Sequence, residues 1–226
     1  MNKLTHTVIL GSYNRPKLIS RAITSILDQT CQDFQLLVTD DGSNEATLQA
    51  IRALIGKDKR CTVHTVDRGD DLKERKDCAN RAVQRINDVI PLVSGDLVHY
   101  LADDDWYDTR RFEVFNELFS DDEIVVGYGR LIYVDVSGLP NGRTIYVDRV
   151  TDPCNVLDHN QVAHRKLVFD RFPRWADAID YSSEGHFFRS MSQHWEFHGI
   201  DQVIAYKRLH SLCMQVTLER STGKRE

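Results

Sequence analysis

The chain has 226 residues, of which 41% are hydrophobic and 28% are charged. This composition is typical of a globular protein and excludes collagen-like, coiled-coil and intrinsically disordered chains. The 29 basic and 34 acidic residues give a net charge of −5. That charge balance weighs against nucleic acid or an anionic membrane as the partner, apart from a local basic patch.

Apolar runs and cysteines indicate the cellular compartment. The apolar run near the N-terminus, Val8–Leu10, is too short for a signal peptide or a membrane span, and no later run reaches spanning length. The five cysteines are an odd number, lie far apart and form no CxxC pair. We therefore expect a cytoplasmic protein with no transmembrane segment, reduced cysteines and no zinc site.

Strand and helix patterns alternate through the first half of the chain. The apolar spacing predicts strands over 6–11, 34–38, 61–66 and 97–102, and helices from Asn14-Arg15-Pro16 onward, over 47–55 and over 73–90. Such alternation predicts an α/β fold with a mainly parallel sheet and helices on both faces. Ligands of these sheets bind outside the carboxyl ends of the strands, so we expect the chemistry there.

The second half has a different pattern. Segments 123–134 and 142–150 flank a turn over 137–142, which predicts a β-hairpin. Short helices are predicted within 160–172 and 184–192. We find no linker or repeat, so we expect one domain with a smaller antiparallel part.

Three consecutive aspartates, Asp103, Asp104 and Asp105, directly follow a buried strand. One of them, or Asp108, could simply cap the next helix. A cap does not explain three neighbouring carboxylates, whose repulsion costs stability. A divalent cation would relieve that repulsion and bridge to a diphosphate.

A second acidic pair, Asp40 and Asp41, ends the neighbouring strand. Asp-Gly-Ser is also ordinary turn chemistry, and alone it favours a turn. Together with the 12–14 segment after the first strand and the 103–105 cluster, it favours a carboxylate that accepts hydrogen bonds from a nucleotide.

Basic residues at 73–76 begin the third predicted helix, where the helix dipole disfavours cations. They could be a solvated helix start, or Arg75 could face an anionic diphosphate. We expect Arg21 and Arg81 to be surface charges. Taken alone, Asp158 and Glu184 favour structural roles.

The ordered motifs resemble the family 2 glycosyltransferases, which have the GT-A fold, and within them the enzymes of bacterial spore-coat polysaccharide synthesis. The resemblance covers roughly residues 6–210 and rests on SYNRP, SILDQT, DFQLLVTDDGSNEATL, KERKDCANRAVQRIN, GDLVHYLADDDWY and DPCNVLDHNQVAHR. It implies transfer of a sugar, with inversion, from a UDP- or dTDP-type donor to an acceptor hydroxyl. It also implies a nucleotide-sugar half over about 1–106, an acceptor half over about 107–215 and a tail over 216–226.

The resemblance assigns roles residue by residue. It implies that the nucleotide is bound by Ser12, Tyr13, Asn14, Asp41, Arg75, Asp103 and Asp104. It places Mn²⁺ or Mg²⁺ on Asp104, with Asp105 beside it and His210 closing over the diphosphate or the metal. Glu184 takes the place of the catalytic base, and Asp158 is the second acidic candidate on the acceptor side.

Three positions depart from the family pattern. Ala102 stands where many members have the first aspartate of the metal motif, Gly11 replaces a common threonine, and Glu184 replaces a usual aspartate. Because of Ala102, a second hypothesis stays open, in which the chain is a degenerate module that binds a nucleotide sugar without turnover. A nucleotidyltransferase would need a glycine-rich phosphate loop, which SYNRP is not. The expected acceptor is a saccharide or glycoconjugate, with a modified DNA base as the unusual alternative.

Overall fold

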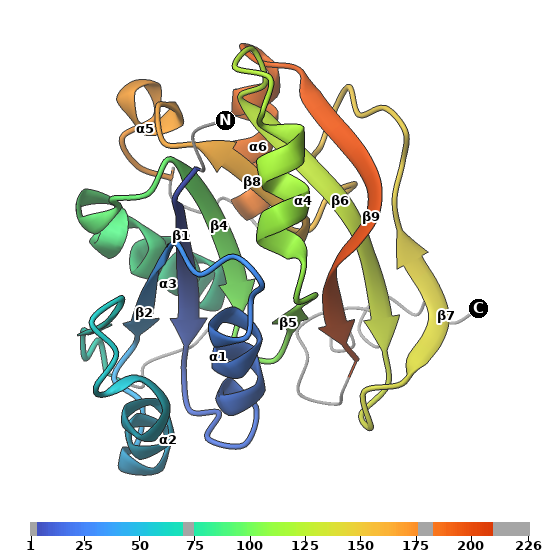
Figure 1. Ribbon diagram of the computed structural model, residues 1–226. Coiled ribbons are helices and arrows are strands. Elements are labelled where there is room, and N and C mark those ends of the chain that lie inside the picture. Colours follow the sequence, from blue (N-terminus) through green and yellow to red (C-terminus); the bar gives the residue numbers. More distant parts are fainter. Residues whose placement is uncertain (1–3, 70–74, 176–182, 210–226) are drawn as a thin grey trace.

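The structure is a computed structural model that describes residues 4–69, 75–175 and 183–209 (Figure 1). In chain order its elements are β1 (His6–Ser12), α1 (Ile19–Leu27), β2 (Phe34–Asp40), α2 (Glu45–Ile55), β3 (Cys61–Thr65), α3 (Arg75–Val89), η1 (Ile90–Leu92), β4 (Leu97–Ala102), β5 (Trp106–Tyr107), α4 (Arg111–Leu118), β6 (Val126–Val134), β7 (Pro140–Ile145), η2 (His159–Gln161), β8 (Val162–Arg165), α5 (Val168–Arg171), α6 (Ser183–Ser192) and β9 (Phe197–Arg208). The strands form one sheet in the order β3-β2-β1-β4-β8-β6-β9-β5, with β7 beside β6.

The first half of the sheet is parallel. β1 lies between β2 and β4, and β3 pairs with the outer side of β2. The register sets Ser12 opposite Asp40 and Gly11 opposite Ala102. The carboxyl ends of the three strands therefore meet at one edge, and the two acidic clusters of the sequence leave the sheet there.

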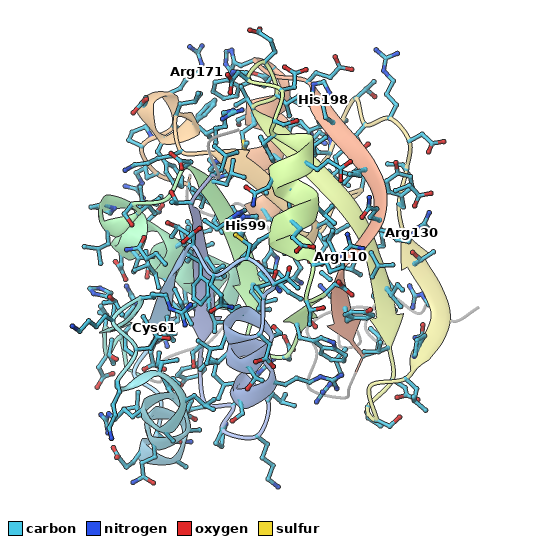
Figure 2. All side chains as sticks on the ribbon, viewed as in Figure 1. Cys61, His99, Arg110, Arg130, Arg171 and His198 are labelled. Carbon is cyan, nitrogen blue, oxygen red and sulfur yellow. The ribbon has the colours of Figure 1, made fainter. Side chains whose placement is uncertain are left out.

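Both faces of the sheet are covered, which explains the continuous apolar runs in its strands. Val8 and Leu10 pack into a core cluster with α1, α2 and α4, whereas Ile9 packs into a second cluster with α3 and α6. His99 of β4 lies beside α4 (Figure 2) and is buried, with its Nε2 2.9 Å from Nδ1 of His6. Within the described part of the chain, no helix is both long and apolar enough to cross a membrane.

The second half adds antiparallel pairs and curls the sheet. β8 runs antiparallel to β4 and to β6, β6 and β9 are parallel, and β5 returns antiparallel to β9. Because β5 begins only a few residues after β4, its pairing of Trp106 with Tyr206 brings the end of β9 to the acidic cluster. The mainly parallel α/β sheet with a smaller antiparallel part is confirmed.

Two strands of the second half were missed. The short helix predicted within 160–172 is present as α5, but the same segment also contains strand β8, whose residues Val162–Arg165 lie between β4 and β6. The twelve-residue strand β9 was not predicted. In both cases pairing with β6 decides the conformation, and such tertiary contacts override local propensity. The predicted hairpin is confirmed, with β7 ending at Ile145 and not near 150.

Candidate active site

The loop after β1 is held against the acidic end of β4. The backbone N–H of Tyr13 donates to Oδ2 of Asp103 at 3.0 Å, and Nη1 of Arg15 lies 3.2 Å from Oδ1 of the same carboxylate. The same Nη1 also donates to Oδ2 of Asp104. Burial, with Asp104 as a further cause, raises the pKa of Asp103 to about 6 against the opposing effects of Arg15, Tyr13 N–H and Arg85.

The loops after β1 and β2 are bonded to each other. Asn14 has a φ of 52°, a left-handed conformation that asparagine tolerates better than most residues. Its N–H donates to Oγ of Ser43 at 2.9 Å, and its Oδ1 accepts from the N–H of Asn44 at 2.8 Å. The segment Ser12-Tyr13-Asn14 therefore lies between the two acidic clusters, where the sequence predicted it.

Asp41 is buried and binds two arginines. Nη1 of Arg68 lies 2.7 Å from its Oδ1, and Nη1 of Arg81 lies 3.2 Å from its Oδ2. The prediction that Arg81 is a surface charge is wrong, because only 9% of the residue is exposed. The helix face that carries Arg81 is turned toward Asp41 by the packing of α3 on the sheet. Arg75 begins α3, but its side chain lies outside the part that the structure describes.

A third arginine, Arg85, extends over the end of β1. Its guanidinium lies 3.7 Å from the position that a Cβ on Gly11 would take, so a threonine there would meet it. Its Nη1 donates to the carbonyl of Ser12 at 3.3 Å. Burial lowers the pKa of Arg85, although Asp103, Asp41 and Asp40 oppose the shift.

Several buried polar atoms at this edge have no hydrogen-bond partner among the described residues. They are Oγ of Ser12, Oδ1 of Asp40 and Nε of Arg85. Buried polar groups are nearly always paired in folded proteins, so unpaired ones require an explanation. A polar ligand at the carboxyl ends of β1 and β2 would supply their partners.

Asp105 has different partners from its neighbours. Its Oδ1 accepts from the N–H of Arg208 at 2.8 Å, and its Oδ2 accepts from Nδ2 of Asn160 at 2.8 Å. Burial and the charge of Asp104 raise the pKa of Asp105 well above its usual range. Both oxygens therefore attach β9 and η2 to the end of β4, and the predicted role of Asp105 beside the metal stays a prediction.

Asn160, which the sequence reasoning missed, joins the two halves. Its Oδ1 accepts from the N–H of Ala102 at 3.1 Å, and its Nδ2 reaches both Asp105 at 2.8 Å and Asp158 at 2.7 Å. The side chain is fully buried. A polar triplet such as His159-Asn160-Gln161 has no sequence motif that would have indicated this role.

Asp158 is a paired structural acid. Its carboxylate caps η2 by accepting from the N–H of Asn160 at 3.0 Å, and it forms an ion pair with Nζ of Lys207. Burial alone would raise the pKa of Asp158, but Lys207, His159 and the cap lower it to about 2. A carboxylate with so low a pKa is a weak proton acceptor.

Glu184 lies in the first turn of α6, and its side chain is 32% exposed. Nδ1 of His159 is 4.0 Å from Oε1 of Glu184 and 3.8 Å from Oδ1 of Asp158, so one histidine faces both candidate acids. The start of α6 packs closely on the loop before η2, since a Cβ on Gly185 would lie 2.8 Å from Sγ of Cys154. His159 is a second residue that the sequence reasoning missed.

A divalent cation fits the acidic pair in chemical terms. Among the described residues no group of three or more His, Cys, Asp or Glu side chains could hold a metal alone. Mg²⁺ and similar ions are commonly bound by one or two carboxylates together with substrate phosphates. Asp103 and Asp104 already share a cation, the Arg15 guanidinium. His210 lies outside the described residues, so its predicted contact stays a prediction.

Two of the three tryptophans, Trp106 and Trp175, pack inside the protein. Trp106 lies between the guanidinium of Arg21, 3.3 Å from its ring centroid, and the ring of Tyr206, stacked at 5.6 Å. Trp175 is 2% exposed. The rings of Trp106 and Trp175 are therefore not free platforms for a sugar. A cavity of about 400 Å³ lies beside the Trp106 stack and is lined in part by Arg21, Asp28 and Tyr206.

Comparison with known proteins identifies the family. The sequence profile described as "Glycosyl transferase family 2" matches residues 7–168, more than half of the chain. The chain belongs to the family 2 glycosyl transferases. The match includes both acidic clusters, the arginines of α3 and the network around Asn160.

Two curated proteins are similar to this chain over most of its length. Protein CgeD of Bacillus subtilis is 26% identical over 215 residues, which are 88% of this chain and 48% of that protein. An uncharacterized glycosyltransferase of Haemophilus influenzae is 23% identical over 171 residues, 76% of this chain and 64% of that protein. The chain thus spans less than two thirds of each relative.

Solved structures of similar fold include two complexes with nucleotide ligands. S. aureus TarS residues 1–349, in complex with UDP, superposes with a TM-score of 0.74 at 16% identity and covers 91% of this chain and 61% of that one. The mannosyltransferase PcManGT of Pyrobaculum calidifontis, in complex with GDP-Man and Mn²⁺, gives 0.68 at 13% identity and covers 98% and 61%. The GT-A type of fold is thereby confirmed.

Proposed function

We propose that this family 2 chain transfers a sugar, with inversion and with the help of Mn²⁺ or Mg²⁺, from a UDP- or dTDP-type nucleotide sugar to an acceptor hydroxyl. The observation that carries the proposal is the acidic pair Asp103–Asp104, held by Tyr13 and Arg15 at the edge that also holds Asp41. Structures of TarS with UDP-GlcNAc and of PcManGT with GDP-Man support a nucleotide-sugar donor.

The nucleotide would lie across the carboxyl ends of β1, β2 and β4. In this proposal Ser12, Tyr13 and Asn14 line one side, and Asp103 accepts from the ribose. Asp41 and its arginines Arg68 and Arg81 form the base side, and Arg75 approaches from the start of α3. The unpaired Ser12 Oγ, Asp40 Oδ1 and Arg85 Nε supply further polar contacts at the same edge.

The metal would be held by Asp104 and the donor diphosphate, with His210 as the further predicted ligand. When bound, such a cation neutralises the charge that develops on the departing diphosphate. The arginines of this edge act on the same charge, because a guanidinium pairs well with phosphate oxygens.

Glu184 is the proposed base. An inverting transfer needs one carboxylate to accept the proton of the acceptor hydroxyl while that oxygen attacks the anomeric carbon, whose bond to the diphosphate oxygen breaks. Glu184 is about one third exposed and faces His159, whereas Asp158 is bound to Lys207 and has a pKa of about 2. Asp158 becomes the residue that positions η2. The acceptor proposed here is a saccharide or glycoconjugate.

A donor screen tests the function. UDP, dTDP and GDP, and their sugars, are added with and without Mn²⁺, and the unfolding temperature is recorded. A ligand at 100 times its dissociation constant adds about 2.7 kcal/mol to the stability. We expect one nucleotide to stabilise the protein in a metal-dependent way, and its sugar to be hydrolysed slowly to the free nucleoside diphosphate. Stabilisation without any release of nucleoside diphosphate would instead favour the binding module that Ala102 keeps open.

A further inference from the structure

Arg15 occupies the place of a cation between two carboxylates. Its Nη1 lies 3.2 Å from Oδ1 of Asp103 and donates also to Oδ2 of Asp104. These carboxylates are 9% and 11% exposed at the side chain, so their mutual repulsion is poorly screened by water. The guanidinium compensates that repulsion in the protein without ligands.

The backbone of Arg15 is fixed although its side chain is long. Its carbonyl accepts from the N–H groups of Leu18 and Ile19, both at 3.1 Å, at the entrance to α1. Asp103 has a second hydrogen-bond partner besides Arg15, because the N–H of Tyr13 donates to its Oδ2. The guanidinium, which is 28% exposed at the side chain, can therefore leave the pair without unfolding the loop that carries it.

A guanidinium and a divalent metal compete for the Asp104 carboxylate at this site. A metal such as Mg²⁺ binds oxygen ligands at about 2.0–2.1 Å. A charge-assisted N–H···O bond has an N···O distance of about 2.7–2.9 Å, so it brings the positive guanidinium close to the same oxygen. Two cations at the same Oδ2 of Asp104 would repel each other strongly. Binding of the metal to this carboxylate therefore favours release of the guanidinium.

We propose that Arg15 is an internal counter-ion that a divalent metal displaces from Asp104, and that the displaced guanidinium then binds the donor diphosphate. This inference rests on the proposed function, since it takes Asp104 as the metal ligand. The exchange makes metal and nucleotide cooperative: the metal frees Arg15 for the diphosphate, and the diphosphate offers the freed guanidinium a new anionic partner. Cooperativity of this kind is reciprocal between the two ligands.

The test measures Mn²⁺ affinity by calorimetry and by the electron paramagnetic resonance signal of free Mn²⁺, with no nucleotide present. Arg15→Gln removes the competitor and should raise the Mn²⁺ affinity by about 10-fold to 100-fold, which corresponds to the loss of one charge-assisted hydrogen bond. Arg15→Lys keeps the charge but loses the planar fork, so its affinity should lie between the two. Arg21→Gln is the matched control, because it removes an arginine of α1 that contacts Trp106, and it should leave the Mn²⁺ affinity unchanged.

A second arm repeats the titrations with the nucleoside diphosphate that the donor screen selects. The nucleoside diphosphate should raise the Mn²⁺ affinity of the parent protein more than that of Arg15→Gln, because the variant has no guanidinium that could move from Asp104 to the diphosphate. Circular dichroism checks that each variant is folded. If Arg15→Gln does not fold, the comparison is made with Arg15→Lys.

The outcomes separate the two proposals. If Asp104→Asn abolishes Mn²⁺ binding while Arg15→Gln binds Mn²⁺ no better than the parent, the displacement is wrong and the metal site stands. Weaker binding by Arg15→Gln would show that Arg15 shapes the site and does not compete for it. If no variant binds Mn²⁺, with or without nucleotide, both the metal dependence and the displacement are overturned.

Discussion

The ion pair of Asp158 with Lys207 gives a prediction whose magnitude follows from the structure. Asp158→Asn removes the charge but keeps the cap of η2, because asparagine and aspartate are equally good at that position. The pKa of Asp158 is lowered from 3.8 to about 2 in the folded protein. Since one pKa unit corresponds to about 1.36 kcal/mol, the charged carboxylate contributes about 2.5 kcal/mol at neutral pH.

The pH dependence has a defined sign. A folded-state pKa below the unfolded value stabilises the protein at pH values above the unfolded pKa, and that contribution is lost as the pH falls through the folded pKa. We therefore expect Asp158→Asn to lower the free energy of unfolding by about 2–3 kcal/mol at pH 7. The gap between parent and variant should narrow between about pH 5 and pH 2, which is the window set by the two pKa values.

Urea denaturation at a series of pH values measures this gap. Asp152→Asn is the control, because Asp152 pairs with Arg189 on the surface, with both side chains about half exposed. That variant should change stability little. The assignment of Asp158 as a buried charge paired with Lys207 would be refuted if Asp158→Asn were as stable as the parent at pH 7. It would also be refuted if the difference in unfolding free energy did not become smaller at acidic pH.

Two further predictions concern catalysis and donor binding. Glu184→Gln should lower turnover by about 10²–10⁴-fold at saturating donor, with donor affinity unchanged. Glu196→Gln, at an exposed position, is the control and should leave turnover unchanged. Near-normal turnover in Glu184→Gln would show that Glu184 is not the base. Arg81→Lys should weaken nucleotide binding and lower stability by about 2 kcal/mol, because lysine cannot replace the hydrogen bonds of Arg81 to Asp41 and the main chain. Arg52→Lys, at a position that is 61% exposed at the side chain, is the matched control. Calorimetry that finds equal nucleotide affinity for the two arginine variants would contradict this assignment.

The parallel half of the fold could be predicted because its strands are short apolar runs between turn signals. Val8–Leu10 and the segment 97–102 are buried on both faces, so their patterns are continuous and easily recognised. β9 was missed because its sequence FHGIDQVIAYKR mixes Gly199 and Asp201 with apolar residues. Its pairing with β6 is a long-range contact that no local pattern reveals.

The site was predicted where carboxylates end strands and missed where charges pair across the fold. Asp103 and Asp104 stand out because they form an acidic run directly after the core strand β4. The burial of Arg81 depends on Asp41, forty positions away in the sequence, and nothing in the helical pattern of α3 indicates it. Lys207 and Asn160 likewise gain their roles only when β9 and η2 reach the end of β4.

The three-point attachment of the Asn160 amide has a mechanical consequence. It bonds the main chain of β4 at Ala102 to carboxylates that fasten β9 and η2, so these parts form one rigid block. The carboxylates at the end of β4 and the strand β9 therefore cannot change position independently of each other. A ligand that binds at the donor edge meets a carboxyl end of β4 whose place relative to β9 and η2 is set before binding.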